Sequence, residues 1–226
     1  MKWQFGFCAF KSAFLVLILS ISAIAAPAEL PSVSVREHLG EKLDLALQFV
    51  DSADRQKHAL GAYFKNGKPT ILNLVYFECP MLCTLLLNGV SDGMKGMDWA
   101  VGDQFNVLTI SIDPKDDSNI AEQKRNAYIT NYSEAKARGP AHSEALAKAG
   151  WHFFTGDEAT IKKLAAQLGF NYEYDQLQQQ YSHPAVTFFI TPEGVISRYL
   201  YGIAYPPKEL RMALVESSDG QLGSFF

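Results

Sequence analysis

The stretch Tyr76-Phe77-Glu78-Cys79-Pro80-Met81-Leu82-Cys83-Thr84 is the segment around which this chain is organised. It follows the apolar run at 71–75 and leads into the apolar run at 85–90, so it joins a buried strand to a helix. Pro80 suits the first helical position, because the amide hydrogen that proline lacks would be unpaired there. This places Cys79 at or near the N-cap, where exposed amides carry partial positive charge and lower the pKa of a cysteine.

The two cysteines of this stretch are close enough to act together. Cys83 lies four residues after Cys79, on the same face of the predicted helix. Such a pair either forms a disulfide or serves as two soft ligands, which select Cu(I), zinc or iron–sulfur chemistry over hard cations. A purely structural disulfide is the weaker interpretation, because it closes a short loop and removes little entropy from the unfolded chain.

Length and composition indicate one globular domain. The chain has 226 residues, of which 48% are hydrophobic and 12% aromatic, enough for one well-filled core but few for two. The formal net charge is -4. Because nucleic-acid binding requires a basic surface, we expect no nucleic-acid partner.

The first 25 residues have the pattern of a secretory signal peptide. Two lysines precede the apolar run at 13–19, and Ala23-Ile24-Ala25 gives the small-x-small pattern of a cleavage site. An uncleaved anchor is the alternative, but this run is shorter than the roughly 20 residues of a spanning helix. We therefore expect an exported protein, periplasmic or on the outer face of the cytoplasmic membrane, that meets the membrane only through a partner or an uncleaved signal. Cys8 lies in the segment to be removed. In an oxidising compartment, thiolate roles for the remaining pair require a reductant or a bound metal.

The rest of the chain divides into three predicted regions. Residues 26–42 are expected to form a flexible leader, 43–218 the folded domain and 219–226 a polar tail. Alternating apolar residues at 43–49 predict a half-buried strand, which belongs to a short hairpin ahead of the main sheet.

Periodicity within the domain predicts alternating strands and helices. The predicted strands are 70–77, 105–112, 151–155, 172–174, 185–190 and 195–200, and the predicted helices run from the cysteines to 97 and over 119–132, 157–168 and 206–216. This order predicts an α/β, thioredoxin-like fold, with a central mixed sheet flanked by helices and an extra N-terminal hairpin. That fold keeps its reactive thiols where the first central strand meets a helix.

With these features, the chain resembles the Sco/SenC family of copper chaperones of cytochrome c oxidase assembly. Four places between 43 and 216 carry the resemblance: the Cys79–Cys83 pair, the acidic segment at 111–117, the strand ending Thr155-Gly156, and His183 ahead of a strand and Pro192-Glu193-Gly194. The chain departs from the family between its cysteines, where Asp is common and Met81-Leu82 stand here, and in having Thr84 in place of Pro. These departures bear on partner choice and redox potential more than on metal binding.

The resemblance implies a copper site made of Cys79, Cys83 and His183, for Cu(I) or Cu(II), which would be delivered to the binuclear copper site of a respiratory cytochrome c oxidase. The implied partners are the copper-bearing oxidase subunit and a thiol reductant. Two thiolates and an imidazole would also accept zinc. The alternative function is a thiol-disulfide oxidoreductase that reduces the partner's cysteines, with Cys79 and Cys83 as the redox-active pair and no need for His183. A peroxidase would need Thr or Ser shortly before its cysteine, and 74–78 holds neither.

Without the resemblance, His183 is interpreted as a loop histidine. His58, His142 and His152 have no cysteine nearby in the sequence, and we expect them to be ordinary histidines.

Further soft or acidic side chains flank the cysteines. Met94 and Met97 lie on the apolar stripe of the predicted helix and are expected in the core. Met81 lies between the cysteines, where its thioether could shield or contact a metal. Glu78 and Asp113 are interpreted as solvated or capping residues rather than as an acid and a base.

Overall fold

The computed structural model describes residue 1 and residues 32–79, 81–136 and 144–223. The predicted signal peptide, Cys8, Pro80 and His142 lie outside the described residues. Within the described ranges, no helix combines the length and the apolar character that a membrane crossing requires.

A seven-stranded mixed sheet forms the centre of the domain, with the strand order β11-β10-β4-β5-β6-β2-β3. The strands are β2 (Gln48–Asp51), β3 (Lys57–Ala59), β4 (Thr70–Val75), β5 (Asn106–Ser111), β6 (Trp151–Thr155), β10 (Val186–Ile190) and β11 (Ile196–Tyr201). β4, β5 and β6 are parallel, and the other pairs are antiparallel. Every residue of β4 and β5 is buried, as expected for strands covered on both faces.

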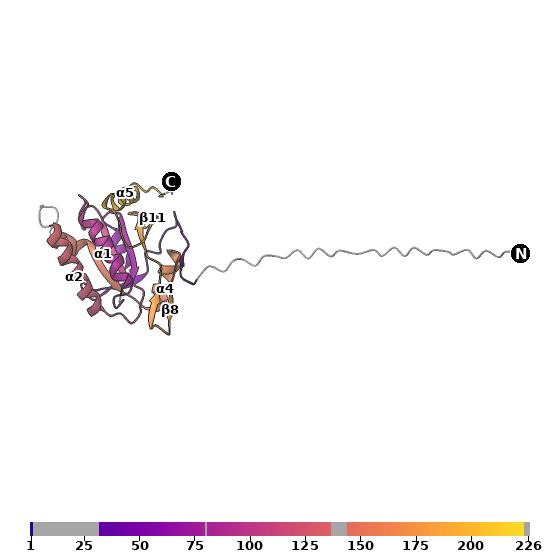
Figure 1. Ribbon diagram of the computed structural model, residues 1–226. Coiled ribbons are helices and arrows are strands. Elements are labelled where there is room, and N and C mark those ends of the chain that lie inside the picture. Colours follow the sequence, from indigo (N-terminus) through magenta and orange to yellow (C-terminus); the bar gives the residue numbers. More distant parts are fainter. Residues whose placement is uncertain (2–31, 80, 137–143, 224–226) are drawn as a thin grey trace. The chain divides into compact units, whose positions relative to one another are not determined.

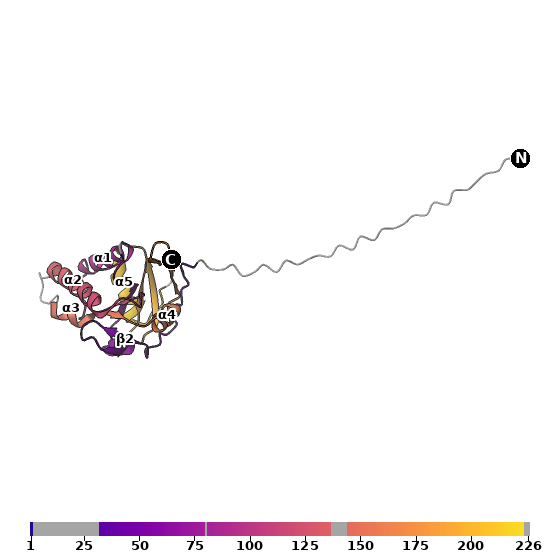
Figure 2. The same ribbon diagram turned by 90° about the horizontal axis from the view of Figure 1, so that it is seen from below.

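Helices cover the two faces of this sheet. They are a 3-10 helix (Leu60–Phe64), α1 (Leu82–Lys95), α2 (Ser118–Lys136), α3 (Glu144–Gly150), α4 (Glu158–Gln167) and α5 (Pro207–Ser218). Figure 1 shows α1 and α2 on one side of the sheet and α4 on the other, and the view from below shows α3 beside α2 (Figure 2). The predicted thioredoxin-like fold with a mixed central sheet is confirmed.

The predicted N-terminal hairpin exists, but it differs in position and in setting. It consists of β2 and β3, and β2 pairs with β6, so the hairpin forms one edge of the main sheet. Residues 43–47 are not a strand. Their apolar side chains alternate because Leu43 and Leu47 are buried, at 3% and 8% exposure. Their backbone does not form a strand; instead, the Leu43 N–H donates a hydrogen bond to the Gly194 carbonyl.

The second half of the expected leader is attached to the domain. β1 (Ser34–Val35) pairs with β7 (Phe170–Asn171). Gly169, at a φ of +59°, turns the chain beside Arg36, and a Cβ there would lie 1.7 Å from the Arg36 carbonyl oxygen. Glycine at this position therefore permits a close backbone contact that holds β1 in place.

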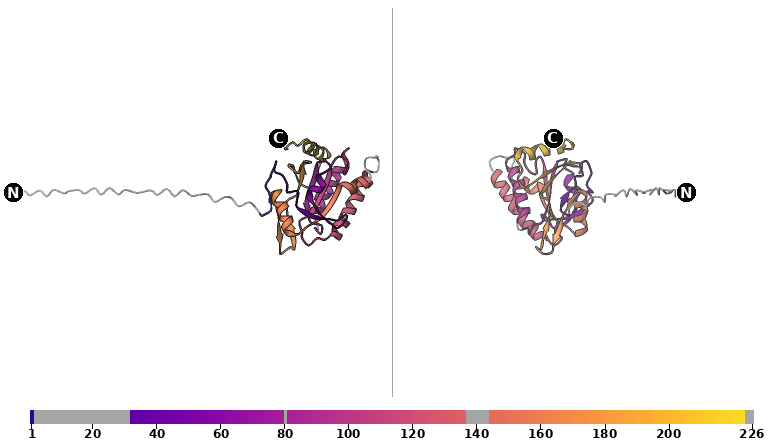
Figure 3. Two further views of the ribbon diagram at one scale, coloured as in Figure 1. Left: turned by 180° about the vertical axis from the view of Figure 1, so that it is seen from behind. Right: turned by 45° about the vertical axis from the view of Figure 1, so that its right-hand side comes forward.

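A further hairpin, of which the periodicity predicts only one strand, follows β7. It consists of β8 (Glu173–Asp175) and β9 (Gln180–Ser182), with residues 176–179 as its turn. Figure 3 shows it at the end of the domain opposite to α5. β9 leads directly into the loop that carries His183.

Candidate metal centre

The pairing of β4 with β10 brings distant residues to one edge of the sheet. These strands are antiparallel neighbours, so the residues after β4 and those before β10 lie at the same edge. Cys83 Sγ lies 3.0 Å from His183 Nε2, although 100 residues separate the two. One ligand atom from each of Cys79, Cys83 and His183 lies within 4.8 Å of the others. The structure thus brings together all three residues that the resemblance implies as ligands.

The start of α1 differs from the prediction. The helix begins at Leu82 with Met81 as its N-cap, so Cys79, expected at or near the N-cap, lies two residues before it. Met81 has φ -146° and ψ -69°, outside the helical region, and this delays the helix. The Cys79 sulfur still accepts a hydrogen bond from the Cys83 N–H at 3.3 Å, and therefore satisfies an amide of the first turn as a capping side chain would.

The two thiols have opposite pKa shifts. Burial opposes ionisation of Cys79, but hydrogen bonds from the Cys83 backbone, the Cys83 side chain and Tyr76 outweigh it and lower the Cys79 pKa. Burial and the neighbouring Cys79 sulfur raise the pKa of Cys83 well above its usual range, although the Tyr76 N–H donates to its sulfur at 3.4 Å. Cys79 is therefore the residue that more readily forms a thiolate, and Cys83 retains its proton.

His183 presents a free ring nitrogen to the cysteines. Its Nδ1 lies 3.0 Å from the Pro184 carbonyl oxygen, and because a carbonyl only accepts, Nδ1 carries the hydrogen. Burial lowers the pKa of His183 and favours the neutral ring, which leaves the Nε2 lone pair directed at Cys83. The backbone contact sets the tautomer in the way that an outer partner orients a metal-bound imidazole. The bond before Pro184 is trans.

The three ligand atoms fit a soft metal ion. Bond lengths of about 2.3 Å to sulfur and 2.0 Å to nitrogen place trigonal ligand atoms roughly 4 Å apart. Cys83 Sγ and His183 Nε2 are 3.0 Å apart, and all three ligand atoms lie within 4.8 Å of one another, so small side-chain shifts would give that spacing. Cys79, Cys83 and His183 are 9%, 2% and 5% exposed, so a metal ion held by them would be largely shielded from water.

The other histidines of the prediction lie away from the cysteines, where described. His58 contacts the Asp54 carboxylate at 2.7 Å. His152, in β6, contacts Asp51 at 2.9 Å, in the neighbouring strand β2. Each has a partner in the part of the chain that holds the edge hairpin, so both behave as structural residues.

The methionines and acids also separate by environment. Met94 and Met97 are buried, at 0% and 5% exposure, and pack in the core as predicted. Met81 is 68% exposed. Glu78 is exposed, and Asp113 accepts a hydrogen bond from the Lys115 N–H at 2.9 Å in a turn.

Asp116 belongs to the site, and no local signal distinguishes it within the acidic segment. Its carboxylate is 8% exposed and accepts hydrogen bonds from the Phe77 N–H at 2.7 Å and the Ser111 hydroxyl at 2.5 Å. It therefore links the loop after β5 to the loop that carries Cys79. Its burial raises the pKa of this carboxyl group.

Aromatic rings pack beside the imidazole. The sequence did not predict this contact, because aromatic residues in strands indicate only that these residues belong to the hydrophobic core. The Tyr76 and Phe170 rings each lie 6.0 Å from the His183 ring, centre to centre, and the Tyr181 ring lies 5.5 Å from the Tyr76 ring.

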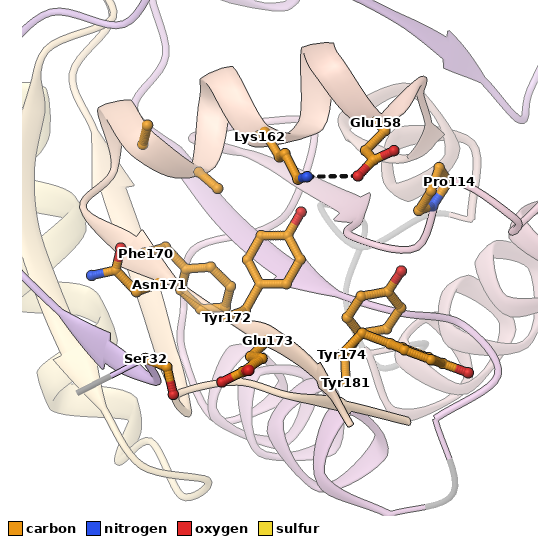
Figure 4. A pocket seen from close by; sticks show the side chains of 12 residues that line it. Ser32, Pro114, Glu158, Lys162, Phe170, Asn171, Tyr172, Glu173, Tyr174 and Tyr181 are labelled. Atoms are coloured by element: carbon orange, nitrogen blue, oxygen red, sulfur yellow. Dashed lines mark hydrogen bonds and ion pairs between the residues drawn. The ribbon is translucent and has the colours of Figure 1, made fainter. Parts of the chain in front are cut away.

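Two clefts lie near these rings. One, of about 440 Å³, is lined by Tyr172, Tyr181 and residues of α4, and no cysteine lines it (Figure 4). A different cleft, of about 390 Å³, is lined by Cys79, Met81 and His183 and is therefore the route to the ligands.

Comparisons with known proteins agree with this fold. Residues 48–217 match the family model for SCO1/SenC. No curated protein matches the sequence significantly.

Several solved structures share the fold at low sequence identity. A putative electron transfer protein from Aquifex aeolicus is 23% identical, with a TM-score of 0.66 over 81% of this chain and 95% of that one. Copper-bound ScoI from Bradyrhizobium japonicum is 20% identical, with a TM-score of 0.53 over 79% of this chain and 99% of that one. Copper-bound yeast Sco1 is 19% identical, with a TM-score of 0.51 over 82% and 91%. Because the family model spans most of the folded domain, the chain belongs to the SCO1/SenC family.

Proposed function

We propose that this protein is an exported metallochaperone that binds copper through Cys79, Cys83 and His183 and delivers it to the binuclear copper site of a respiratory cytochrome c oxidase. The observation that carries the proposal is the 3.0 Å approach of Cys83 Sγ to His183 Nε2. Two sulfurs and one imidazole form a soft ligand set that suits copper in both oxidation states. Relatives of the same fold hold copper, among them yeast Sco1.

The residues of the site have separate roles in this proposal. Cys79, whose pKa is lowered, is the first thiolate to meet the cargo ion. Cys83 loses its proton to the solvent when its sulfur binds the ion, and His183 contributes the Nε2 atom of its neutral ring. The ion leaves by exchange of these ligands for those of the acceptor.

The location and partners follow from the sequence and from the chemistry of the pair. The signal pattern at 1–25 supports export to the periplasm or the outer face of the cytoplasmic membrane. Because an adjacent pair of cysteines oxidises in such a compartment, a thiol reductant has to keep it open. The acceptor is the copper-bearing subunit of the oxidase.

A competition titration tests the copper site. The reduced protein is titrated with Cu(I) against a chromophoric chelator, and with Cu(II), and compared with His183→Ala, Cys83→Ser and the control His58→Ala. We expect one tightly bound copper per wild-type chain, affinity reduced by about tenfold or more in the two site variants, and no change in the control. Weak, sub-stoichiometric binding by the wild type would overturn the proposal.

The unequal thiols favour a second candidate, a thiol-disulfide oxidoreductase. Cys79 has the lowered pKa of an attacking thiol, and Cys83 is the buried thiol that would resolve a mixed disulfide. The histidine separates the two functions, because disulfide exchange does not require it. Reductase turnover that persists in His183→Ala, together with weak copper binding by the wild type, would select this candidate.

A further inference from the structure

All three candidate ligands lie below the protein surface. Cys79, the most exposed of them, is 9% exposed, and Cys83 and His183 are more deeply buried. Cys79 and His183 line the 390 Å³ cleft, so a copper ion arriving from a donor reaches the ligands through it. The residues at the mouth of this cleft meet the ion first.

Met81 is the soft donor at that mouth. It lines the same cleft as Cys79 and His183 and is 68% exposed. The other polar residues of the lining that are not buried, Gln180, Tyr181 and Ser182, have oxygen or nitrogen donors. A thioether prefers Cu(I) to harder ions, whereas amide and hydroxyl groups do not.

The backbone keeps Met81 beside Cys79. Met81 follows Cys79 by two residues in the chain and caps α1 with a non-helical backbone conformation. Its backbone is therefore held beside the Cys79 residue while its side chain remains in solvent. Met94 and Met97 are packed in the core, so they cannot take this role.

Accepting the copper function proposed above, we infer that Met81 is the entry ligand for Cu(I). A bond forms between copper and the Met81 thioether as one ligand of the donor leaves. That bond breaks when the Cys79 sulfur binds, after which Cys83, which releases its proton to the solvent, and the neutral His183 complete the set. Copper remains Cu(I) throughout, and the uncharged thioether releases no proton. On delivery the same steps run in reverse.

The rate of copper loading tests this role. Cu(I) is supplied as its bicinchoninate complex, and the loss of colour of this complex is followed by stopped flow. The wild type is compared with Met81→Leu, which removes only the sulfur. The control is Met212→Leu, an equally conservative change at another exposed methionine, on α5. We expect Met81→Leu to load about tenfold more slowly with an unchanged equilibrium affinity, and Met212→Leu to match the wild type. Cu(II) supplied as its glycine complex should load all three at the same rate.

Two results would overturn the inference. One is an unchanged Cu(I) rate in Met81→Leu, and the other is an equal slowing for Cu(I) and Cu(II), which would indicate the shape of the mouth rather than its sulfur. A wild type that binds no Cu(I) at equilibrium would remove the proposed function and this inference together, whereas tight binding with an unchanged rate removes the inference alone.

A spectroscopic measurement supplies a readout independent of rate. The Cys83→Ser variant, which lacks one buried ligand, is labelled with ¹³C-methyl methionine and followed by NMR. When Cu(I) is added, the methyl signal of Met81 should shift and that of Met212 should not. An unshifted Met81 signal while Cu(I) binds would contradict the role of the thioether.

Discussion

Asp116 Oδ2 accepts a hydrogen bond from the Phe77 backbone N–H at 2.7 Å, across the gap between the loop after β5 and the loop that carries the cysteines. Asp116→Ala leaves this amide and the Ser111 hydroxyl without their acceptor, at a cost of about 1–3 kcal/mol. We expect lower stability in urea unfolding and weaker Cu(I) binding, because the Cys79 loop loses its anchor.

Asp113→Ala is the matched control for this change. Asp113 lies in the same acidic segment, where its carboxylate bonds within its own turn, so it should leave Cu(I) affinity unaltered. Equal effects of the two substitutions on copper binding would refute the role assigned to Asp116.

The cysteines should differ in reactivity. Cys79, with its lowered pKa, should be alkylated by iodoacetamide before Cys83. Because the Cys79 thiolate persists below the ordinary cysteine pKa of 9.0, the rate of Cys79 alkylation should decline only at a lower pH. Tyr76→Phe removes the hydroxyl group that helps to lower the Cys79 pKa and should shift that profile to higher pH, whereas Tyr172→Phe should not. Peptide mass spectrometry across a pH series measures both, and an unshifted profile in Tyr76→Phe would contradict the contact.

The carboxylate of Asp51 should make stability depend on pH at the edge hairpin. It accepts a hydrogen bond from the Tyr63 hydroxyl at 2.8 Å and contacts His152 at 2.9 Å. Although burial raises its pKa, the contact with His152 and a backbone hydrogen bond from Ala53 lower it overall. Because the pKa of Asp51 in the folded protein is below the unfolded value of 3.8, the ionised carboxylate stabilises the fold above pH 3.8. This stabilisation is lost as the pH falls through the pKa of the folded state.

We therefore expect Asp51→Asn to be less stable than the wild type by about 1–3 kcal/mol near neutral pH, with a difference that shrinks toward acid pH. Urea unfolding at several pH values measures it. Asp54→Asn, at an exposed aspartate paired with His58, should change stability by about 1 kcal/mol or less. A difference between wild type and Asp51→Asn that grew in acid would contradict the sign.

Gly89 should resist a substitution that helix propensity favours. Alanine in place of a helical glycine usually stabilises by about 1 kcal/mol. Here the added Cβ would lie 2.1 Å from the Ile203 carbonyl oxygen, and backbone cannot move aside as a flexible side chain can. We expect a net loss of roughly 1–2 kcal/mol in thermal or urea unfolding. Asn88→Ala, at the exposed neighbouring position, loses the hydrogen bond that Asn88 accepts from the Tyr128 hydroxyl and should stay within about 1 kcal/mol of wild type. A Gly89→Ala protein as stable as wild type would show that α1 shifts to accommodate the methyl group.

Local pattern predicted most of the fold. The apolar runs that form β4 and β5 and the stripe of α1 are visible in the sequence, because period and composition are local properties. The pattern failed at 43–47, where buried leucines alternate without a strand, and at the start of α1, where the conformation of Met81 excludes Cys79 from the cap. At 43–47 a tertiary contact decides the backbone, because the Leu43 N–H bonds to the distant Gly194 carbonyl.

The sequence by itself determined the pair of cysteines at a strand–helix junction, one α/β domain with a mixed sheet, and the motifs that resemble a family. Only the tertiary structure decided that His183 meets Cys83, because that contact depends on β10 pairing with β4, and strand order is not encoded in any local stretch. The same holds for the unequal thiols and for the exposed thioether of Met81. A pKa and an exposed fraction depend on which distant segments cover a group, and those segments meet only in the folded chain.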